Sequence, residues 1–108
     1  MKWVIPSECQ ISAHTFAIRF SPVILDAAGA RGQSEYLEKQ IIRLKPGRSS
    51  SQTCQSFLHE VMHSIDMVLG ADENVNEATI RFLSAGLTQV LLSLGIKPDF
   101  SQIPEEEL

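Results

Sequence analysis

The sequence predicts a small α+β domain in which a short antiparallel sheet of about three strands packs on two antiparallel helices. One segment alternates between apolar and polar residues, as a half-buried strand does. Two later segments have the helical spacing of apolar residues, and each ends at a glycine. The chain has 108 residues, 44% hydrophobic and 20% charged, which suits a single globular domain with one modest core.

The first half of the chain contains the predicted strands. In residues 11–20, "ISAHTFAIRF", the side chains alternate so that one face is largely apolar, which predicts a half-buried strand. Proline and glycine residues then mark turns around a short helical turn at 23–28. The stretches 32–36, "GQSEY", and 39–45, "KQIIRLK", read as two strands of a hairpin joined by a tight turn.

The segment 48–70, "RSSSQTCQSFLHEVMHSIDMVLG", predicts the first long helix. A serine among residues 49–51 can cap its N-terminus, and Gly70 suits the position after its C-terminus. At about 100° per residue, one arc is apolar and is the predicted core face. That arc consists of Leu58, Val61, Ile65 and Leu69. The opposite, solvent-facing side is predicted to carry His59, Glu60, His63 and Asp66.

A second helix is predicted from about Val75 to Leu94, followed by Gly95. Its predicted apolar stripe consists of Ile80, Leu83, Leu87, Val90, Leu91 and Leu94. Residues 95–108 contain two prolines and an acidic end, so we expect a loosely attached tail within a single domain that spans 1–108.

The composition disfavours several classes of partner. The formal net charge is −4 and the nine basic residues form no stripe, which argues against nucleic-acid binding. No apolar run reaches the roughly 18 residues that a membrane span needs, and the N-terminal apolar patch is too short for a secretory signal. We therefore expect a cytoplasmic protein in which Cys9 and Cys54 are free thiols, the latter in the core. The oligomeric state stays open.

Residues 59–63 read His-Glu-Val-Met-His, which is the pattern H-E-x-x-H. Side chains four residues apart on a helix lie side by side, so His59 and His63 can share one ion. Zinc favours imidazole nitrogen, and a catalytic zinc site has three protein ligands and a fourth position open to water. Glu60 leans away from direct ligation but can reach that water. The alternative is that these residues only decorate a solvated helix face, and a chance match is expected in under about 1% of chains this short.

The third ligand is predicted on the second helix. Glu77 lies 14 positions after His63, in the first turn of that helix, and an antiparallel helix pair would return it to the motif. Its alternative role is a capping box with Asn74. Glu73 and, more weakly, Asp72 compete as ligands from the turn. A ligand on a helix is better positioned than one in a turn, which favours Glu77.

The two segments "LHEVMHSID" and "NEATIRFLSAGLTQVL" resemble the small gluzincin-type zinc metallopeptidases of phages and prophages, which are related to the ImmA/IrrE-type family. The resemblance runs from about Ile11 to Leu94, and its most specific part is H-E-x-x-H-x-x-D. It implies a zincin-like fold and a Zn²⁺ ion held by His59, His63 and Glu77. It also implies a hydrolase that cleaves peptide bonds with Glu60 as the general base.

Further residues are candidates for supporting roles. Asp66 follows His63 by one turn and could hold the other nitrogen of that imidazole, or it could be a solvated acidic residue. Tyr36, His14 and Arg43 are candidate donors to the oxyanion of the reaction. For His14 and Tyr36, packing in a strand is the better supported interpretation.

The predicted function is therefore a zinc metallopeptidase that acts on a peptide or protein substrate. In zincins an edge strand runs above the metal helix and binds the peptide, and residues 40–44 are the expected edge strand. The alternative is a non-catalytic, zinc-stabilised binding or regulatory module of phage or prophage origin. Glu60 favours the enzyme, because a structural site needs no base and tends to have four protein ligands. A third interpretation is a metal-free domain whose polar face binds a partner.

Overall fold

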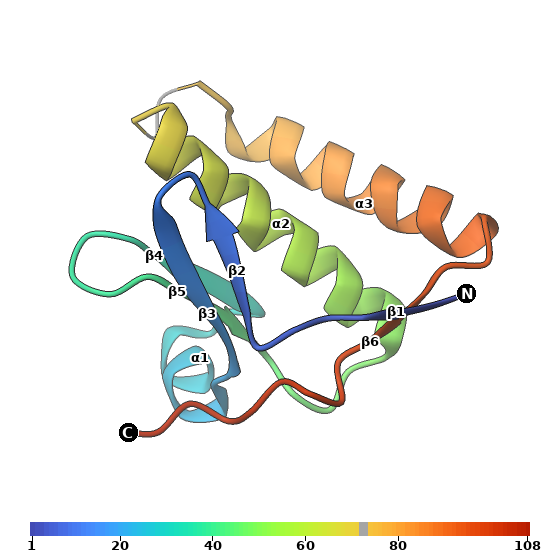
Figure 1. The fold of residues 1–108 in the computed structure, drawn as a ribbon, viewed down its shortest axis with the longest axis horizontal. Helices are drawn as coiled ribbons and strands as arrows, with labels where there is room; N and C mark the ends of the chain where they lie inside the picture. The colour runs from blue at the N-terminus through green and yellow to red at the C-terminus, as the bar shows by residue number, and fades with distance from the viewer. Residues whose placement is uncertain (72–73) are drawn as a thin grey trace.

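The computed structural model describes residues 1–71 and 74–108, which form an α+β fold of three helices and two sheets (Figure 1). The elements follow in the order β1 (Lys2–Val4), β2 (Glu8–Ile11), β3 (His14–Phe20), α1 (Pro22–Ala28), β4 (Gly32–Glu35), β5 (Ile41–Leu44), α2 (Ser50–Leu69), α3 (Glu77–Ser93) and β6 (Lys97–Asp99). The two long helices, α2 and α3, lie side by side and run antiparallel, as predicted. No helix among these residues is both long and apolar enough to cross a membrane.

The main sheet has four strands in the order β2-β3-β5-β4, and the prediction of a purely antiparallel sheet was wrong. The outer pairs are antiparallel, but β3 and β5 are parallel, with Ile18 opposite Ile42. The segment between β3 and β5 contains α1 and β4, and it is long enough for the crossover that a parallel pair requires. The strand predicted at 11–20 begins only at His14, because Ser12 adopts a φ of 55° in the turn between β2 and β3.

The edge of the main sheet beside α2 is β4, and the prediction that residues 40–44 form the edge strand was wrong. All four residues of β5 are buried, and β5 lies between β3 and β4. Three of its four residues are apolar, and the fourth, Arg43, is paired with Glu35 and Glu106. Within the described part of the chain, β4 pairs with β5 alone, so the other side of β4 has no strand partner.

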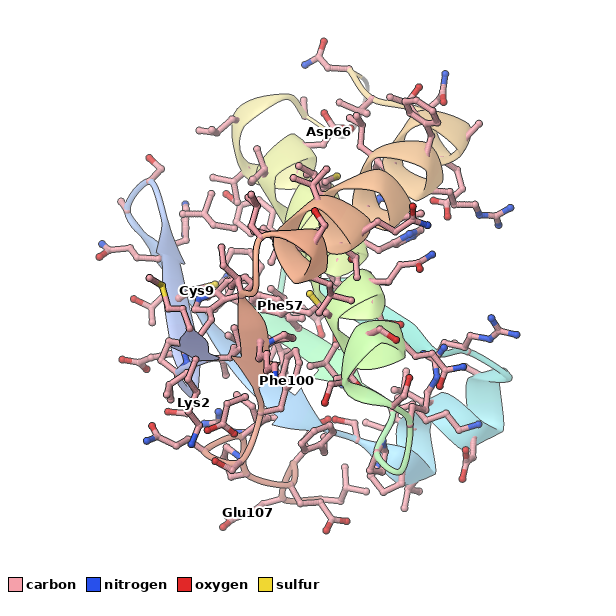
Figure 2. All side chains as sticks on the ribbon, turned by 90° about the vertical axis from the view of Figure 1, so that its right-hand side faces the viewer. Lys2, Cys9, Phe57, Asp66, Phe100 and Glu107 are labelled. Carbon is pink, nitrogen blue, oxygen red and sulfur yellow. The ribbon has the colours of Figure 1, made fainter. Side chains whose placement is uncertain are left out.

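The core lies between the main sheet, α2 and the C-terminal segment. Its buried members are Ile5, Ile11, Phe16, Ile18, Ile42, Leu44, Phe57 and Ile103. Phe57 of α2 contacts the ring of Phe100, with ring centroids 6.0 Å apart in an edge-to-face arrangement (Figure 2). This contact attaches the chain after β6 to the middle of α2.

The α2 helix begins where the sequence predicts, but its buried face differs from the prediction. Ser49 is the N-cap and forms a capping box with Gln52. The buried residues are Thr53, Cys54, Phe57, Glu60, Ser64 and Asp66. Ile65 and Leu69, which were predicted to be core residues, are 41% and 67% exposed. The sheet lies against the face of α2 that contains Phe57 and Glu60. This face overlaps only in part with the apolar face predicted from the sequence.

The α3 helix turns small polar side chains toward the interior and large apolar side chains outward. Ile80, Ser84 and Thr88 are its buried residues. The hydroxyl of Thr88 donates to the carbonyl of Ser84 at 2.7 Å, so burial leaves no unpaired donor on this side chain. The rest of the predicted stripe includes four exposed members: Leu83, Leu87, Val90 and Leu94. Met62, Ile65, Leu69, Val75 and Leu83 line one groove, so apolar residues of both helices meet on an open surface.

The prediction of a loosely attached tail over residues 95–108 was wrong. The β6 strand pairs in parallel with β1, and Ile103 is only 7% exposed. Further on, the Glu106 carboxylate accepts hydrogen bonds from Arg43 at 2.8 Å and from Ser21 at 2.7 Å. The hydrogen bonds and charge of Arg43 lower the pKa of Glu106 to about 2. The acidic C-terminal end is therefore held in place by the buried Arg43.

Candidate metal centre

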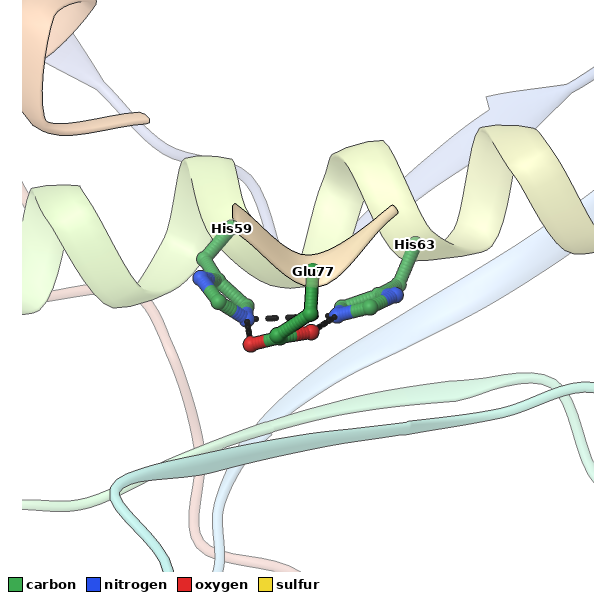
Figure 3. A group of neighbouring side chains, drawn as sticks. All are labelled: His59, His63 and Glu77. Carbon is green, nitrogen blue, oxygen red and sulfur yellow. Dashed lines mark hydrogen bonds and ion pairs between the residues drawn. The ribbon is translucent and has the colours of Figure 1, made fainter. Parts of the chain in front are cut away.

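His59 and His63 project from successive turns of α2 and meet the carboxylate of Glu77 at the start of α3 (Figure 3). The Nε2 atom of His59 lies 2.9 Å from Oε1 of Glu77, and that of His63 lies 2.7 Å from Oε2. The two Nε2 atoms are 3.2 Å apart. The structure thus brings together the three side chains that the sequence predicts as metal ligands.

The position of Glu77 follows from how α3 begins. Asn76 is the N-cap, and its side chain accepts the N–H of Thr79 at 2.8 Å. Asn74 donates to the carbonyl of Gly70 instead, so the alternative capping box of Asn74 with Glu77 is not formed. The Glu77 carboxylate is therefore left to face the histidines. The competing ligands Glu73 and Asp72 lie outside the described residues.

The donor set fits a zinc ion. A zinc–nitrogen bond of about 2.0–2.1 Å in a tetrahedral site separates neighbouring ligand atoms by about 3.3 Å. The two imidazole nitrogens, 3.2 Å apart, are close to that value, and one carboxylate oxygen of Glu77 lies within 3 Å of each of them. Two imidazole nitrogens at 3.2 Å either share one proton in an N–H···N hydrogen bond or, when both are unprotonated, direct two lone pairs at each other, which repel. A cation between them would turn two lone pairs into an attractive arrangement.

The pKa shifts of His59 and Glu77 also favour the forms that bind a metal. Burial is the largest influence on the pKa of His59 and lowers it, although the Glu77 carboxylate acts in the opposite direction. Burial alone would raise the pKa of Glu77, but His59 and His63 outweigh it, so the pKa of Glu77 is lowered. Neutral imidazoles and an ionised carboxylate are the forms that bind a metal.

Glu60 lies on the side of α2 that faces β4, and the prediction that it lies on the face opposite the core was wrong. It is 7% exposed, and Oε1 accepts a hydrogen bond of 3.0 Å from the hydroxyl of Ser34. Burial raises the pKa of Glu60, and this effect exceeds the opposing influence of Ser34 and His63. A raised pKa makes this carboxylate a better proton acceptor, which suits a general base.

Sequence reasoning missed two residues of β4 that shape the surroundings of Glu60. Gly32 and Ser34 are two positions apart on the strand, so both face α2. A Cβ atom on Gly32 would lie 3.1 Å from both Cγ and Oε2 of Glu60. The pattern Gly-x-Ser on a strand next to the motif helix is the signal that could have identified them.

Asp66 does not contact the imidazole of His63. Its carboxylate, at the C-terminal end of α2 (Figure 2), accepts the backbone N–H groups of Asn74 and Val75, each at 3.2 Å. Asp66 is 4% exposed. Asp66 therefore has neither of the two roles considered from the sequence, and it instead fixes the chain just before α3.

The three candidate oxyanion donors lie elsewhere. The hydroxyl of Tyr36 is 3.1 Å from Nε2 of His14, and the Tyr36 ring stacks on Phe16. Arg43 is bound to Glu35 and Glu106. None of the three candidates lines the groove beside the histidines.

That groove has a volume of about 760 Å³ and opens between α1, the start of β4 and the two long helices. We call it the central groove. Its lining includes His59, Glu60 and Glu77, together with residues 29–32 and the first two turns of α2. The ligand cluster is therefore reachable from outside, as a substrate site requires.

Comparison with known proteins leaves the family of this chain open. No family model, no curated protein and no solved structure matches it. The resemblance to gluzincin-type metallopeptidases therefore depends on the H-E-x-x-H-x-x-D residues and on the geometry of the centre.

Proposed function

We propose that this chain is a zinc-dependent metallopeptidase with a zincin-like fold. The observation that supports this most is the convergence of His59, His63 and Glu77 at separations that suit zinc. Glu60, a buried carboxylate one residue after His59 on α2, adds the general base that such a site needs. When bound, Zn²⁺ supplies a Lewis acid that polarises a carbonyl and lowers the pKa of water.

Glu60 is the general base in this proposal. It takes a proton from the attacking water and later delivers that proton to the leaving amine. The Ser34 hydroxyl holds one carboxylate oxygen, and Gly32 leaves room for the other. The β4 strand therefore orients the base from the sheet side, while α2 carries it.

The substrate in this proposal is a peptide or protein segment in extended form. The free side of β4 offers backbone N–H and C=O groups to such a segment. Because Gly32 and Ser34 lie on β4 and contact Glu60, a peptide paired with this strand would lie beside the base. Backbone pairing recognises extended shape more than side chains.

The decisive experiment is the variant Glu60→Gln. We expect it to retain one equivalent of zinc and to lose cleavage of a proteome-derived peptide library by about 10²- to 10⁴-fold. Glu38→Gln, an exposed carboxylate in the turn after β4, is the matched control and should cleave like the wild type. Unchanged cleavage by Glu60→Gln would contradict the assignment of the base.

The second candidate is a zinc-stabilised binding module without catalysis. The open apolar surface of α2 and α3 favours it, since such surfaces mark interaction sites. One equivalent of zinc in the wild-type protein, with no cleavage of any library peptide, would select this candidate.

A further inference from the structure

Three of the five arginines of this acidic chain line the central groove. Arg31 directly precedes β4, Arg48 lies two residues before α2, and Arg81 is one turn after Glu77 on α3. They come from separate parts of the sequence, and the fold brings them to the groove that His59 and Glu77 also line. Among the described residues, the acidic members of the lining are Glu60 and Glu77, which belong to the centre itself.

Arg31 and Arg48 line the central groove and have no carboxylate partner among the residues that the structure describes. By contrast, Arg43 pairs with Glu35 and Glu106, and Arg81 pairs with Glu77. Arg19 donates to backbone carbonyls. Two guanidinium groups at one groove thus keep their charge uncompensated.

Arg48 is also held in place. Its Nη1 donates to the hydroxyl of Ser56 at 2.8 Å, which fixes the guanidinium beside α2 and leaves other N–H groups for a ligand. Burial and, after it, the nearby charge of Arg31 lower the pKa of Arg48. An anion between these two like charges would relieve their repulsion.

We propose that the central groove binds an acidic side chain of the substrate, with its carboxylate held by Arg31 and Arg48. That this acidic side chain belongs to a substrate rests on the proposed peptidase function, whereas its binding by the two arginines does not. The planar guanidinium matches a carboxylate through two parallel hydrogen bonds. A nucleic-acid backbone is the poorer match, because a chain of net charge −4 repels a polyanion at long range.

The test measures binding without cleavage. Zinc-loaded Glu60→Gln protein is titrated with a fluorescein-labelled peptide that contains a Glu-Glu pair, with the Gln-Gln version, and with a single-stranded oligonucleotide. We expect the Glu-Glu peptide to bind at least about tenfold more tightly than the Gln-Gln peptide. Adding Arg31→Gln and Arg48→Gln should remove this difference.

The matched control adds Lys2→Gln and Lys45→Gln instead, which lowers the net charge equally at exposed positions. This control should keep the difference between the two peptides. Equal binding of both peptides, a difference that survives the arginine substitutions, or tighter binding of the oligonucleotide would each overturn the proposal. Tighter binding of the Glu-Glu peptide, without cleavage of any peptide by the wild type, would contradict the peptidase function and leave the proposed binding site standing.

A second observation, independent of the metal centre, concerns the outer face of α3. Leu83, Leu87, Val90 and Leu94 follow one another at spacings of four, three and four residues and are 42%, 44%, 52% and 68% exposed. This is the heptad spacing of a coiled-coil seam. Residues 82–96 contain no ionisable side chain. The seam is thus apolar, exposed and uncharged.

Gly86 lies within the same stretch of α3. A Cβ atom at this position would meet no atom of the described residues within 4 Å. Glycine weakens a helix interior relative to alanine, and the open space around Gly86 shows no internal contact that requires it. Close approach of another helix from outside would account for a residue without a side chain.

We infer that a second copy of this chain covers the seam, with the two α3 helices packed antiparallel about a two-fold axis. A two-fold interface needs only one self-complementary surface, and this one is apolar throughout. Two chains of net charge −4 can pair here without placing like charges opposite each other.

Sedimentation equilibrium across the micromolar range tests this pairing. We expect a dimer mass for the wild type and a monomer mass for Leu87→Glu, with unchanged circular dichroism. Leu37→Glu adds the same charge at an apolar residue that is 91% exposed on another part of the surface, and it should stay dimeric. A monomeric wild type, or a Leu87→Glu protein that remains dimeric, would overturn the inference.

Discussion

The carboxylate of Asp66, on the first long helix, holds the backbone of Val75, two residues before Glu77. Oδ2 accepts the N–H of Val75 and Oδ1 that of Asn74, each at 3.2 Å. Asn76 then caps α3, so the path of the chain into this helix decides where Glu77 points. Asp66 therefore positions a candidate zinc ligand that it does not touch.

The variant Asp66→Asn should weaken zinc binding. An amide group in place of the carboxylate turns an NH₂ toward one of the two backbone donors, so the chain before α3 shifts and Glu77 shifts with it. We expect zinc affinity to fall by about tenfold or more, as measured by competition with a chromophoric chelator. Asp26→Asn, at an exposed carboxylate, is the control. Unchanged affinity would show that Glu77 keeps its place without Asp66.

Zinc should raise the melting temperature of the protein, because only the folded chain brings His59, His63 and Glu77 together. At free zinc 100-fold above the dissociation constant, linkage predicts about 2.7 kcal/mol of stabilisation. Calorimetry should show this gain in the wild type and its reversal by a chelator. His63→Ala should lose most of the gain. A wild-type melting temperature that does not change when zinc is added would contradict the metal site.

Gly32→Ala should reduce peptide cleavage while leaving the fold intact. Its Cβ would lie 3.1 Å from Cγ and Oε2 of Glu60, so the carboxylate must move by a few tenths of an ångström. We expect a severalfold loss in kcat/KM, below the roughly 100-fold loss that a 1 Å misplacement causes. Gln33→Ala, whose side chain points to the other face of β4, should cleave normally. Full activity of Gly32→Ala would mean that the position of Glu60 tolerates this displacement.

Glu106→Gln should destabilise the protein at neutral pH. The ordinary pKa of 4.5 falls to about 2 in the folded chain, and the Glu106 side chain is only 5% exposed. Because the folded-state pKa is lowered, this stabilisation is present above about pH 4.5 and is lost as the pH falls toward 2. We expect the free energy of unfolding at pH 7 to fall by about 2 kcal/mol in denaturant titrations.

The same titrations between pH 4.5 and 2 should show a shallower loss of stability in Glu106→Gln than in the wild type. Glu107→Gln, at an exposed neighbour, should behave like the wild type at every pH. Identical acid profiles for Glu106→Gln and the wild type would contradict the role of the Arg43–Glu106 pair.

Features that depend on neighbouring residues along the chain could be predicted from the sequence. The Ser49 cap of α2 and the end of this helix at Leu69 follow from capping and helix-stop signals. The side-by-side placement of His59 and His63 follows from the helical repeat alone. A short connection between two helices favours an antiparallel pair, and this places Glu77 beside the histidines.

Only the tertiary structure decided which neighbour covers each face. Periodicity places Ile65 and Leu87 on the apolar faces of their helices, but both residues are exposed. A helix buries the faces that its neighbours contact, and the sheet contacts the face of α2 that contains Glu60. The edge position of β4 and the anchoring of Glu106 depend on pairings between residues far apart in the chain. Such pairings form through long-range packing and charge, which leave no local pattern in the order of the residues.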